Sequence, residues 1–307
     1  MIELAPRQSL GPYRLLQRLG AGGMAEVWLA QAHGASGFER KVALKLLLPE
    51  LREHPRMLRA LIEEARLGAR LQHRNLVQVH DLAVADGIYF LRLDYVEGID
   101  LRTLLARTRP SPGLALLIAE EIVLALDYLH RARDDDGRPL GLVHRDVSPG
   151  NVLLSVSGEV KLSDYGVTKA TMLADVTRAG VVKGKYAYMS PEQVAGVPLD
   201  ARSDQFGLGV TLCELLTGAR PFDGGSPLET MERIRAAEPP TLEDLEGDLR
   251  QLILRCLARE PRDRFQDELS LLRDLYPCRS VRPAGALDLA FLVGSLLTHS
   301  VGNPNSL

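Results

Sequence analysis

Hydrophobic and polar positions alternate over short stretches in the first third of the chain, the pattern of β-strands that bury one face. The predicted strands are 13–19, 26–32, 41–47, 76–83 and 88–95. Within 55–72, apolar residues instead recur every three or four positions, which predicts a helix with one buried face. The last two strands flank Asp86-Gly87, a pair typical of a two-residue hairpin turn. We therefore expect a β-rich unit with one helix up to about residue 96.

Beyond Glu97-Gly98 the apolar positions follow the spacing of amphipathic helices. The predicted helices are 114–131, 203–216, 228–236, 245–258 and 267–275, with short strands and loops within 142–162. The predicted fold class is therefore α+β and bilobal, with a β-rich N-terminal lobe, a hinge near Asp94–Gly98 and a mainly helical C-terminal lobe. The expected boundaries are an extension over 1–12, a domain over 13–276 divided near residue 96, and a tail over 277–307 with one more helix packed on the C-terminal lobe. A docking or dimerisation segment is the alternative for the tail.

The composition narrows the class of protein. The 307 residues carry 37 basic and 40 acidic side chains, so nothing predicts a nucleic-acid or anionic-membrane surface. Cys213, Cys256 and Cys278 show no CxxC pairing, which argues against a disulfide framework or a zinc site and favours a reducing compartment. No signal peptide and no membrane span is predicted. We expect a cytoplasmic protein.

A glycine cluster lies between the first two predicted strands, in the segment LGAGGMAEV over Leu19–Val27. Gly20, Gly22 and Gly23, with Ala21 between them, would let the backbone approach a polyanion so that amide N–H groups point at phosphates. The segment is not a GxxxxGK[ST] loop, and it opens no helix. A tight glycine-rich turn without a ligand is the alternative interpretation.

A lysine follows on the third predicted strand, where VALK ends at Lys45. A lysine on an apolar strand needs an anionic partner, because an unpaired charge is costly to bury. Glu64 on the following helix is the expected partner, and Glu63 is the alternative. The pair would hold Lys45 toward the α- and β-phosphates of ATP.

Three oxygen-bearing side chains occur in two neighbouring loop segments, VHRDVSPGNVL and LSDYG. Phosphoryl transfer needs a carboxylate that accepts the proton of the incoming hydroxyl and two oxygen ligands for Mg²⁺. Asp146 is the candidate for the first role, and Asn151 and Asp164 are the candidate metal ligands. The alternative is that polar loops of an unrelated fold show this spacing by chance.

These motifs together resemble the eukaryotic-like (Hanks-type) serine/threonine protein kinases of bacteria, from about Tyr13 to Tyr276. The resemblance rests on GAGGMAEV, VALK, HRDVSPGN, DYG in place of DFG, SPE in place of APE, and SDQFGLG, in the family's order. It implies that 13–276 is a protein kinase domain that uses ATP and Mg²⁺ to phosphorylate protein substrates. Pro149 favours serine and threonine acceptors over tyrosine.

The resemblance also assigns roles to residues around the nucleotide and in the C-terminal lobe. The nucleotide contacts would be Asp94, Tyr95 and Val96 in the hinge, Leu93 as gatekeeper, Asp100 on the ribose, and Val27, Ala43 and Leu153 on the two faces of adenine. Ordinary core packing would place similar residues at the adenine positions. Asp204 would anchor the backbone of the catalytic loop, the segment HRDVSPGN over 144–151, and Glu192 would pair with Arg264.

Arg145, next to Asp146, resembles the arginine of kinases that are activated through the loop between Asp164 and Glu192. A phosphate there would pair with Arg145 and order the loop. The candidate acceptors are Thr168, Thr171 and Thr177, of which we favour Thr177. An unmodified polar loop is the alternative.

The sequence departs from the family pattern at three places of interest. Ser148 stands where most such kinases have a lysine, and Lys185 stands where they usually have a threonine. Our hypothesis is an exchange in which Lys185 takes the catalytic role toward Asp146 and the γ-phosphate. Gly68, one turn after Glu64, lacks a side chain that would pack between the lobes, which predicts a loosely held helix.

Three functions remain open at this stage. The preferred one is an active protein kinase, with self-association for phosphorylation in trans as a possible partner interaction. A pseudokinase scaffold that binds nucleotide with little or no catalysis is the first alternative, because of Ser148. A small-molecule phosphotransferase is the second, and the SPE segment with its Arg264 partner argues against it.

Overall fold

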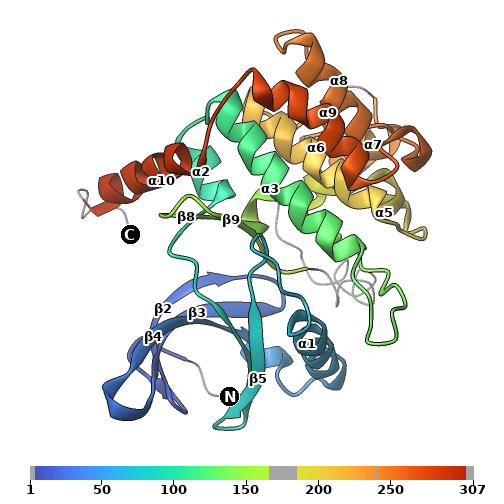
Figure 1. Ribbon diagram of the computed structural model, residues 1–307. Helices are drawn as coiled ribbons and strands as arrows, with labels where there is room; N and C mark the ends of the chain where they lie inside the picture. The colour runs from blue at the N-terminus through green and yellow to red at the C-terminus, as the bar shows by residue number, and fades with distance from the viewer. Residues whose placement is uncertain (1–3, 166–184, 239–240, 302–307) are drawn as a thin grey trace. The chain divides into compact units, whose positions relative to one another are not determined.

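The computed structural model describes residues 4–165, 185–238 and 241–301 (Figure 1). The chain divides into two compact units. Residues 4–73 and 77–95 form the N-terminal unit, and the remaining described residues form the C-terminal unit. One unit is a sheet with a helix and the other is mainly helical, so the predicted α+β class is confirmed.

The N-terminal unit is built on an antiparallel six-stranded sheet with the strand order β1-β2-β3-β4-β6-β5. Its strands are β1 (Ser9–Leu10), β2 (Tyr13–Ala21), β3 (Ala25–His33), β4 (Glu39–Leu47), β5 (Val79–Ala85) and β6 (Ile88–Asp94). All five predicted strands are present. The turn between β5 and β6 has positive φ at both Asp86 (51°) and Gly87 (76°), as a tight hairpin of this type requires.

Part of the expected N-terminal extension belongs to this unit. Ser9 and Leu10 pair with Arg14 and Tyr13 as strand β1. Leu4 and Leu10 are buried with the core residues on one face of the sheet. That core consists of Leu4, Leu10, Tyr13, Leu15, Trp28, Ala30, Val42, Leu44, Leu46, Ile88 and Phe90. The extension therefore covers an edge and a face of the sheet.

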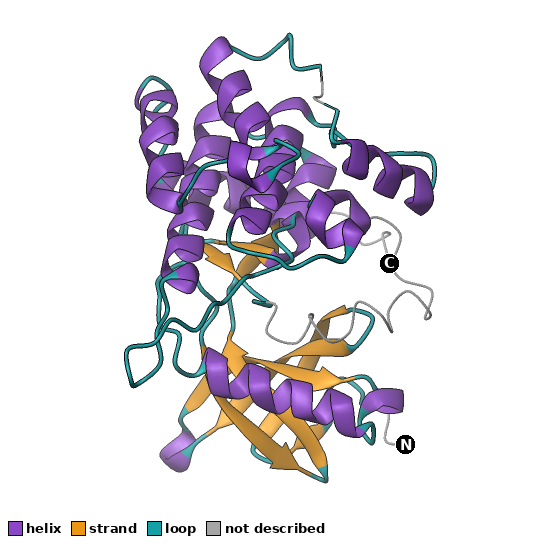
Figure 2. Ribbon diagram, turned by 90° about the vertical axis from the view of Figure 1, so that its right-hand side faces the viewer, coloured by secondary structure: helices purple, strands orange, loops and turns teal. Residues whose placement is uncertain are grey.

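Helix α1 (Pro55–Gly68) packs on β4, β5 and β6, and Figure 2 shows it beside the strands. Its last residue corrects one expectation. A Cβ atom at Gly68 would lie 2.4 Å from Cγ2 of Val79, so the space that a larger residue would occupy is filled from β5. Gly68 allows close packing of α1 on the sheet, and the prediction of missing packing there was wrong.

The C-terminal unit is organised around α3 (Pro112–His130), which packs against α6 (Arg202–Thr217) and α9 (Glu268–Ser280) (Figure 1). Ser111 caps α3 by accepting a hydrogen bond from the Leu114 N–H, and Pro112 occupies its first turn. The other helices are α2 (Leu101–Arg107), α5 (Pro191–Ala195), α7 (Pro227–Ala236), α8 (Gly247–Cys256) and α10 (Ala286–Val301). The 3₁₀ turns are Ala35–Gly37, Pro49–Leu51, Pro149–Asn151, Lys185–Tyr188 and Pro261–Asp263.

A small three-stranded sheet supports the loops of this unit. It consists of β7 (Gly98–Asp100), β8 (Val152–Ser155) and β9 (Val160–Leu162) in that order. Helix α10 packs on β7, β8 and α2 and buries Leu289 and Val293, so the helix predicted in the tail does pack on the C-terminal unit.

Candidate active site

Lys45 and Glu64 form an ion pair within the N-terminal unit. Lys45 Nζ lies 2.6 Å from Glu64 Oε1, and both side chains are largely buried. Strand β4 presents the lysine and α1 presents the carboxylate. The alternative partner, Glu63, is exposed and pairs with Arg66 at 3.2 Å. The pairing predicted from the sequence is therefore confirmed, and it holds the ammonium group of Lys45 in a fixed position.

The strand register puts the predicted adenine contacts of the N-terminal unit beside Lys45. Val27 lies opposite Lys45, and Ala43, two residues before Lys45, lies opposite Leu93. Directly paired residues and residues two apart share a face of a sheet. Val27, Ala43, Lys45 and Leu93 thus share the face opposite the hydrophobic core around Trp28 and Leu44.

The glycine cluster forms an exposed tight turn between β2 and β3, in which the Gly22 N–H donates to the Ala25 carbonyl oxygen at 2.8 Å. Neither Gly20 nor Gly23 has a positive φ, and a Cβ atom at either position would lie in open space. Neither backbone strain nor crowding within the described residues therefore demands glycine at these two positions. Glycine at these positions leaves room for a group that does not belong to the chain, such as a ligand.

A second ion pair fixes the base of this turn. Arg52 Nη2 lies 3.2 Å from Glu26 Oε1, and its Nε donates to the Leu47 carbonyl oxygen. Both side chains are mostly buried. Sequence analysis missed this pair, because the segment that carries Arg52 shows no motif.

The catalytic loop of the C-terminal unit holds Asp146 in a buried position, with 8% of the residue exposed. Asn151 Nδ2 donates to the Asp146 carbonyl oxygen at 2.9 Å, and Ser148 Oγ donates to Asp146 Oδ1 at 3.3 Å. Arg145 has a φ of 67°, an uncommon conformation for a residue other than glycine and one that recurs at functional sites. Two side chains of the loop thus hydrogen-bond to Asp146 from within the loop.

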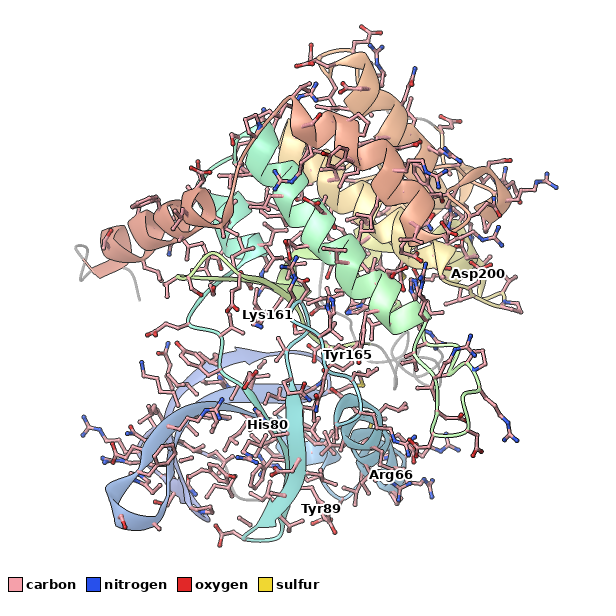
Figure 3. The ribbon with its side chains drawn as sticks, viewed as in Figure 1. Arg66, His80, Tyr89, Lys161, Tyr165 and Asp200 are labelled. Atoms are coloured by element: carbon pink, nitrogen blue, oxygen red, sulfur yellow. The ribbon has the colours of Figure 1, made fainter. Side chains whose placement is uncertain are left out.

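Asp164 follows β9 and is connected to the same loop. The Ser163 N–H and hydroxyl both donate to the Asn151 carbonyl oxygen, at 2.9 and 3.1 Å. His144 Nε2 lies 3.0 Å from the Ser163 carbonyl oxygen. Asp164 also has positive φ (56°), and the next residue, Tyr165, labelled in Figure 3, is buried. The structure therefore brings the segments of Asn151 and Asp164 together, as the metal-ligand prediction requires.

Asp204, at the start of α6, anchors the catalytic loop as the resemblance implied. Its Oδ2 accepts from the His144 N–H and its Oδ1 accepts from the Arg145 N–H, both at 2.7 Å. Gln193 of α5 adds a bond that the sequence did not predict, from its Nε2 to the Arg145 carbonyl oxygen at 2.9 Å. Both peptide groups flanking Arg145 are thereby held.

The predicted pair of Glu192 and Arg264 is also present. Arg264 donates through Nη1 and Nη2 to the two carboxylate oxygens, at 2.7 and 2.9 Å. Burial alone would raise the pKa of Glu192, but hydrogen bonds and charge from Arg264 lower it below its usual value. The carboxylate therefore stays ionised in the interior.

The predicted hinge residues belong to both units. The Asp94 carboxylate, at the end of β6, lies 3.2 Å from Arg40 Nη2 and 2.7 Å from Nε2 of His80, which is labelled on β5 in Figure 3. The Lys41 ammonium group lies 5.8 Å from the centre of the Tyr95 ring. Val96 is half-buried.

In the C-terminal unit, the side chain of Asp100, the expected ribose contact, is already engaged. It caps α2 by accepting from the Thr103 N–H at 2.7 Å and pairs with Arg102 at 2.9 Å. Leu153 lies opposite Asp100 in the β7–β8 ladder. Lys185 begins a 3₁₀ turn, but its side chain lies outside the described residues, as do Thr168, Thr171 and Thr177.

Comparison with known proteins identifies the family. A sequence model described as the protein kinase domain matches residues 13–273. The chain belongs to the protein kinase family. Within this family it is 41% identical to the tyrosine-protein kinase MasK of Myxococcus xanthus over 84% of the chain. It is 36% identical to the serine/threonine-protein kinase PknA of Mycobacterium tuberculosis over 83% of the chain.

The fold agrees with that assignment. The crystal structure of the Mycobacterium tuberculosis PknI kinase domain matches with a TM-score of 0.64 and 30% identity, covering 92% of this chain and all of the solved domain. The chain spans 41% of the length of MasK and 58% of that of PknA. In the described part of this kinase domain, no helix is long and apolar enough to cross a membrane.

Proposed function

We propose that this chain is an active, ATP-dependent kinase that phosphorylates serine and threonine hydroxyls of proteins. Its own activation loop, the segment between Asp164 and Glu192, would be among the substrates. The observation that carries the proposal is the catalytic loop. Asp146 is buried, and its carbonyl oxygen accepts a hydrogen bond from the Asn151 side chain. The Asn151 carbonyl oxygen in turn accepts one from the N–H of Ser163, the residue before Asp164. These contacts support the proposal that Asp146, Asn151 and Asp164 act together in phosphoryl transfer.

Each residue has a distinct proposed role. Asp146 would orient the acceptor hydroxyl and take its proton while the hydroxyl oxygen bonds to the γ-phosphorus and the bond from the γ-phosphorus to the β–γ bridging oxygen breaks, with ADP as the leaving group. Lys45, fixed by Glu64, would bind the α- and β-phosphates. Lys185 would complete the set by taking the role of the lysine that Ser148 replaces.

Protein kinases use ATP and Mg²⁺, and the residues of this chain fit both. Asn151 and Asp164 would supply two oxygen ligands, which suits an ion that keeps water and phosphate oxygens in its shell. The room at Gly20 and Gly23, with Ala21 and Gly22 between them, would admit the phosphates. The face of Val27, Ala43 and Leu93 would receive adenine, with Asp94, Tyr95 and Val96 as the hinge, Leu153 on its other side and Asp100 near the ribose.

The acceptor hydroxyl is the point on which the relatives differ. PknA is named a serine/threonine kinase and MasK a tyrosine kinase, and both are similar over most of this chain. Pro149, which follows the catalytic loop's Ser148, supports serine and threonine. Tyrosine phosphorylation is the second candidate, favoured by the higher identity to MasK.

The remaining proposals concern setting and partners. We propose protein substrates, self-association during phosphorylation in trans, and a cytoplasmic location. The three cysteines support a reducing compartment, since each is a buried free thiol.

A pseudokinase would not need the Lys45–Glu64 ion pair and the ordered loop around Asp146 together.

The test is autophosphorylation of phosphatase-treated protein in Mg²⁺-ATP, read by mass spectrometry of peptides. We expect phosphate on serine or threonine, with Thr177 first, and none in Asp164→Asn. Phosphate on tyrosine alone would establish the second candidate. Bound ATP with no transfer would overturn both in favour of the pseudokinase.

A further inference from the structure

A buried histidine that sequence analysis did not single out lies beside the anchor of the catalytic loop. His130 is the last residue of α3, and its side chain is only 6% exposed. Its Nε2 lies 2.8 Å from Asp204 Oδ2, the same oxygen that accepts the N–H of His144. Its Nδ1 lies 3.1 Å from Oε1 of Glu268, the first residue of α9. One imidazole therefore joins two carboxylates from two helices.

The carboxylates of this cluster favour a protonated histidine. Burial alone would lower the pKa of His130, but the neighbouring carboxylates of Asp204 and Glu268 outweigh it and raise the pKa to about 10. Asp127 of α3, which is paired with Arg131 and partly buried, also interacts electrostatically with His130. Gln205 Nε2 donates to Glu268 Oε1 at 3.3 Å, so Glu268 is held from α6 as well.

The contact between His130 and Glu268 acts through charge. Although the two atoms are 3.1 Å apart, Nδ1 makes no well-aligned hydrogen bond within the described residues. An acidic residue at the start of a helix is common, because it complements the helix dipole. An exposed carboxylate would serve that purpose, whereas Glu268 is 4% exposed and lies against the imidazolium. Its burial therefore needs another explanation.

We propose that Glu268 is a positioning residue for the catalytic loop. It holds the His130 imidazolium, which holds the Asp204 carboxylate, whose two oxygens fix the N–H groups of His144 and Arg145, next to Asp146. The start of α9 is thereby coupled to the geometry of the active site. The catalytic consequence rests on the proposed kinase function, whereas the effect on the backbone of the loop does not.

The test compares Glu268→Gln with a control on the adjacent residue. Asp267→Ala removes the N-cap of α9, where Asp267 Oδ1 accepts from the Ser270 N–H at 2.7 Å, but leaves the contact with His130. Glu268→Gln should fold, because His130 keeps Asp204 as its counter-ion. The readouts are hydrogen exchange of the His144 and Arg145 amides by NMR, and kcat and KM for ATP.

We expect the two amides to exchange about tenfold faster in Glu268→Gln than in wild type, with little change in Asp267→Ala. The kcat of Glu268→Gln should fall by about threefold to thirtyfold with KM for ATP unchanged, because Glu268 acts through His130 and Asp204 on the loop that bears Asp146. Unchanged amide protection in Glu268→Gln, or equal changes in both variants, would overturn the proposal.

A double-variant comparison tests the route of the effect. If Glu268 acts through His130, adding Glu268→Gln to His130→Gln should change amide exchange no further. Additive effects would show that Glu268 acts by another route and would overturn the proposal. Amide exchange also separates the two proposals: a protein that never transfers phosphate would refute the kinase function while these amides still report on the positioning role.

Discussion

Arg264 and Glu192 form a two-armed ion pair inside the C-terminal unit, with the arginine side chain fully excluded from solvent. Ser203 Oγ donates to the same carboxylate at 2.7 Å, and Arg264 also donates to the carbonyl oxygens of Ala258, Arg259 and Arg202. Both buried charges are thereby satisfied. The segment that bears Glu192 is also the one from which Gln193 holds the catalytic loop.

Replacing Arg264 with Met should lower the free energy of unfolding by about 3–5 kcal/mol, because it leaves the Glu192 charge buried without a partner. Urea unfolding followed by circular dichroism measures the loss. The matched control is Arg233→Met, which removes an exposed pair with Glu229 and an exposed hydrogen bond to the Asp223 carbonyl oxygen and should lower the stability far less. Equal losses in the two variants would contradict this account of the buried pair.

The charge on His130 should make stability depend on pH in the alkaline range. The pKa of His130 is raised from 6.5 to about 10 by folding, so its contribution is fully present below pH 6.5 and is lost as the pH rises through 10. The unfolding free energy of wild type minus that of His130→Gln should therefore shrink between pH 6.5 and 10. A difference that stays constant across that range would show that His130 is neutral in the folded protein.

The contact between Gly68 and Val79 predicts a specific rescue. Gly68→Ala should destabilise the protein by about 1–3 kcal/mol, because the new Cβ would lie 2.4 Å from Cγ2 of Val79. In a Val79→Ala background the same change should cost less, since the two methyl groups are absent and only the Cβ of residue 79, at 2.8 Å, still obstructs the new Cβ. Thermal unfolding of the four proteins gives the coupling. Additive changes would contradict the close packing described for α1.

Strand periodicity and motif spacing predicted most of the N-terminal sheet and the residues of the catalytic loop. Strand β1 was missed because two residues carry no periodicity, and its pairing depends on the neighbouring β2. Helix α9 was expected to end at Leu275, yet it continues through Pro277 to Ser280. Proline disfavours the interior of a helix, but Cys278 is buried in this last turn, so packing of the turn outweighs that preference.

The sequence likewise predicted some residues of the candidate site and not others. Lys45, Asp146, Asn151 and Asp164 lie in recognisable motifs, so their types and spacing indicated their chemistry. His130 and Glu268 lie in helices whose sequence gives no such signal, and only the packing of α3 against α6 and α9 brings them together. Gly68 illustrates the reverse case, because an absent side chain was interpreted as missing contact when a strand distant in sequence fills the space.

The exchange between Ser148 and Lys185 predicts a second rescue. Lys185→Thr should lower kcat by about tenfold or more, because it removes the cation proposed to stabilise the transferring phosphate. Adding Ser148→Lys, which returns a lysine to the usual position, should restore much of the loss. Lys183→Thr, two residues away, is the control and should change little. A double variant no faster than Lys185→Thr alone would contradict the exchange.

The central claim is that this chain transfers phosphate to protein hydroxyls with Asp146 as the proton acceptor. The most direct measurement is the rate of γ-phosphate transfer from radiolabelled ATP to casein by wild type and by Asp146→Asn, with ATP binding measured on both. The account predicts steady transfer by wild type, a loss of about a hundredfold or more in Asp146→Asn, and similar ATP affinity. Equal rates in the two proteins, or no transfer by wild type that binds ATP, would contradict it.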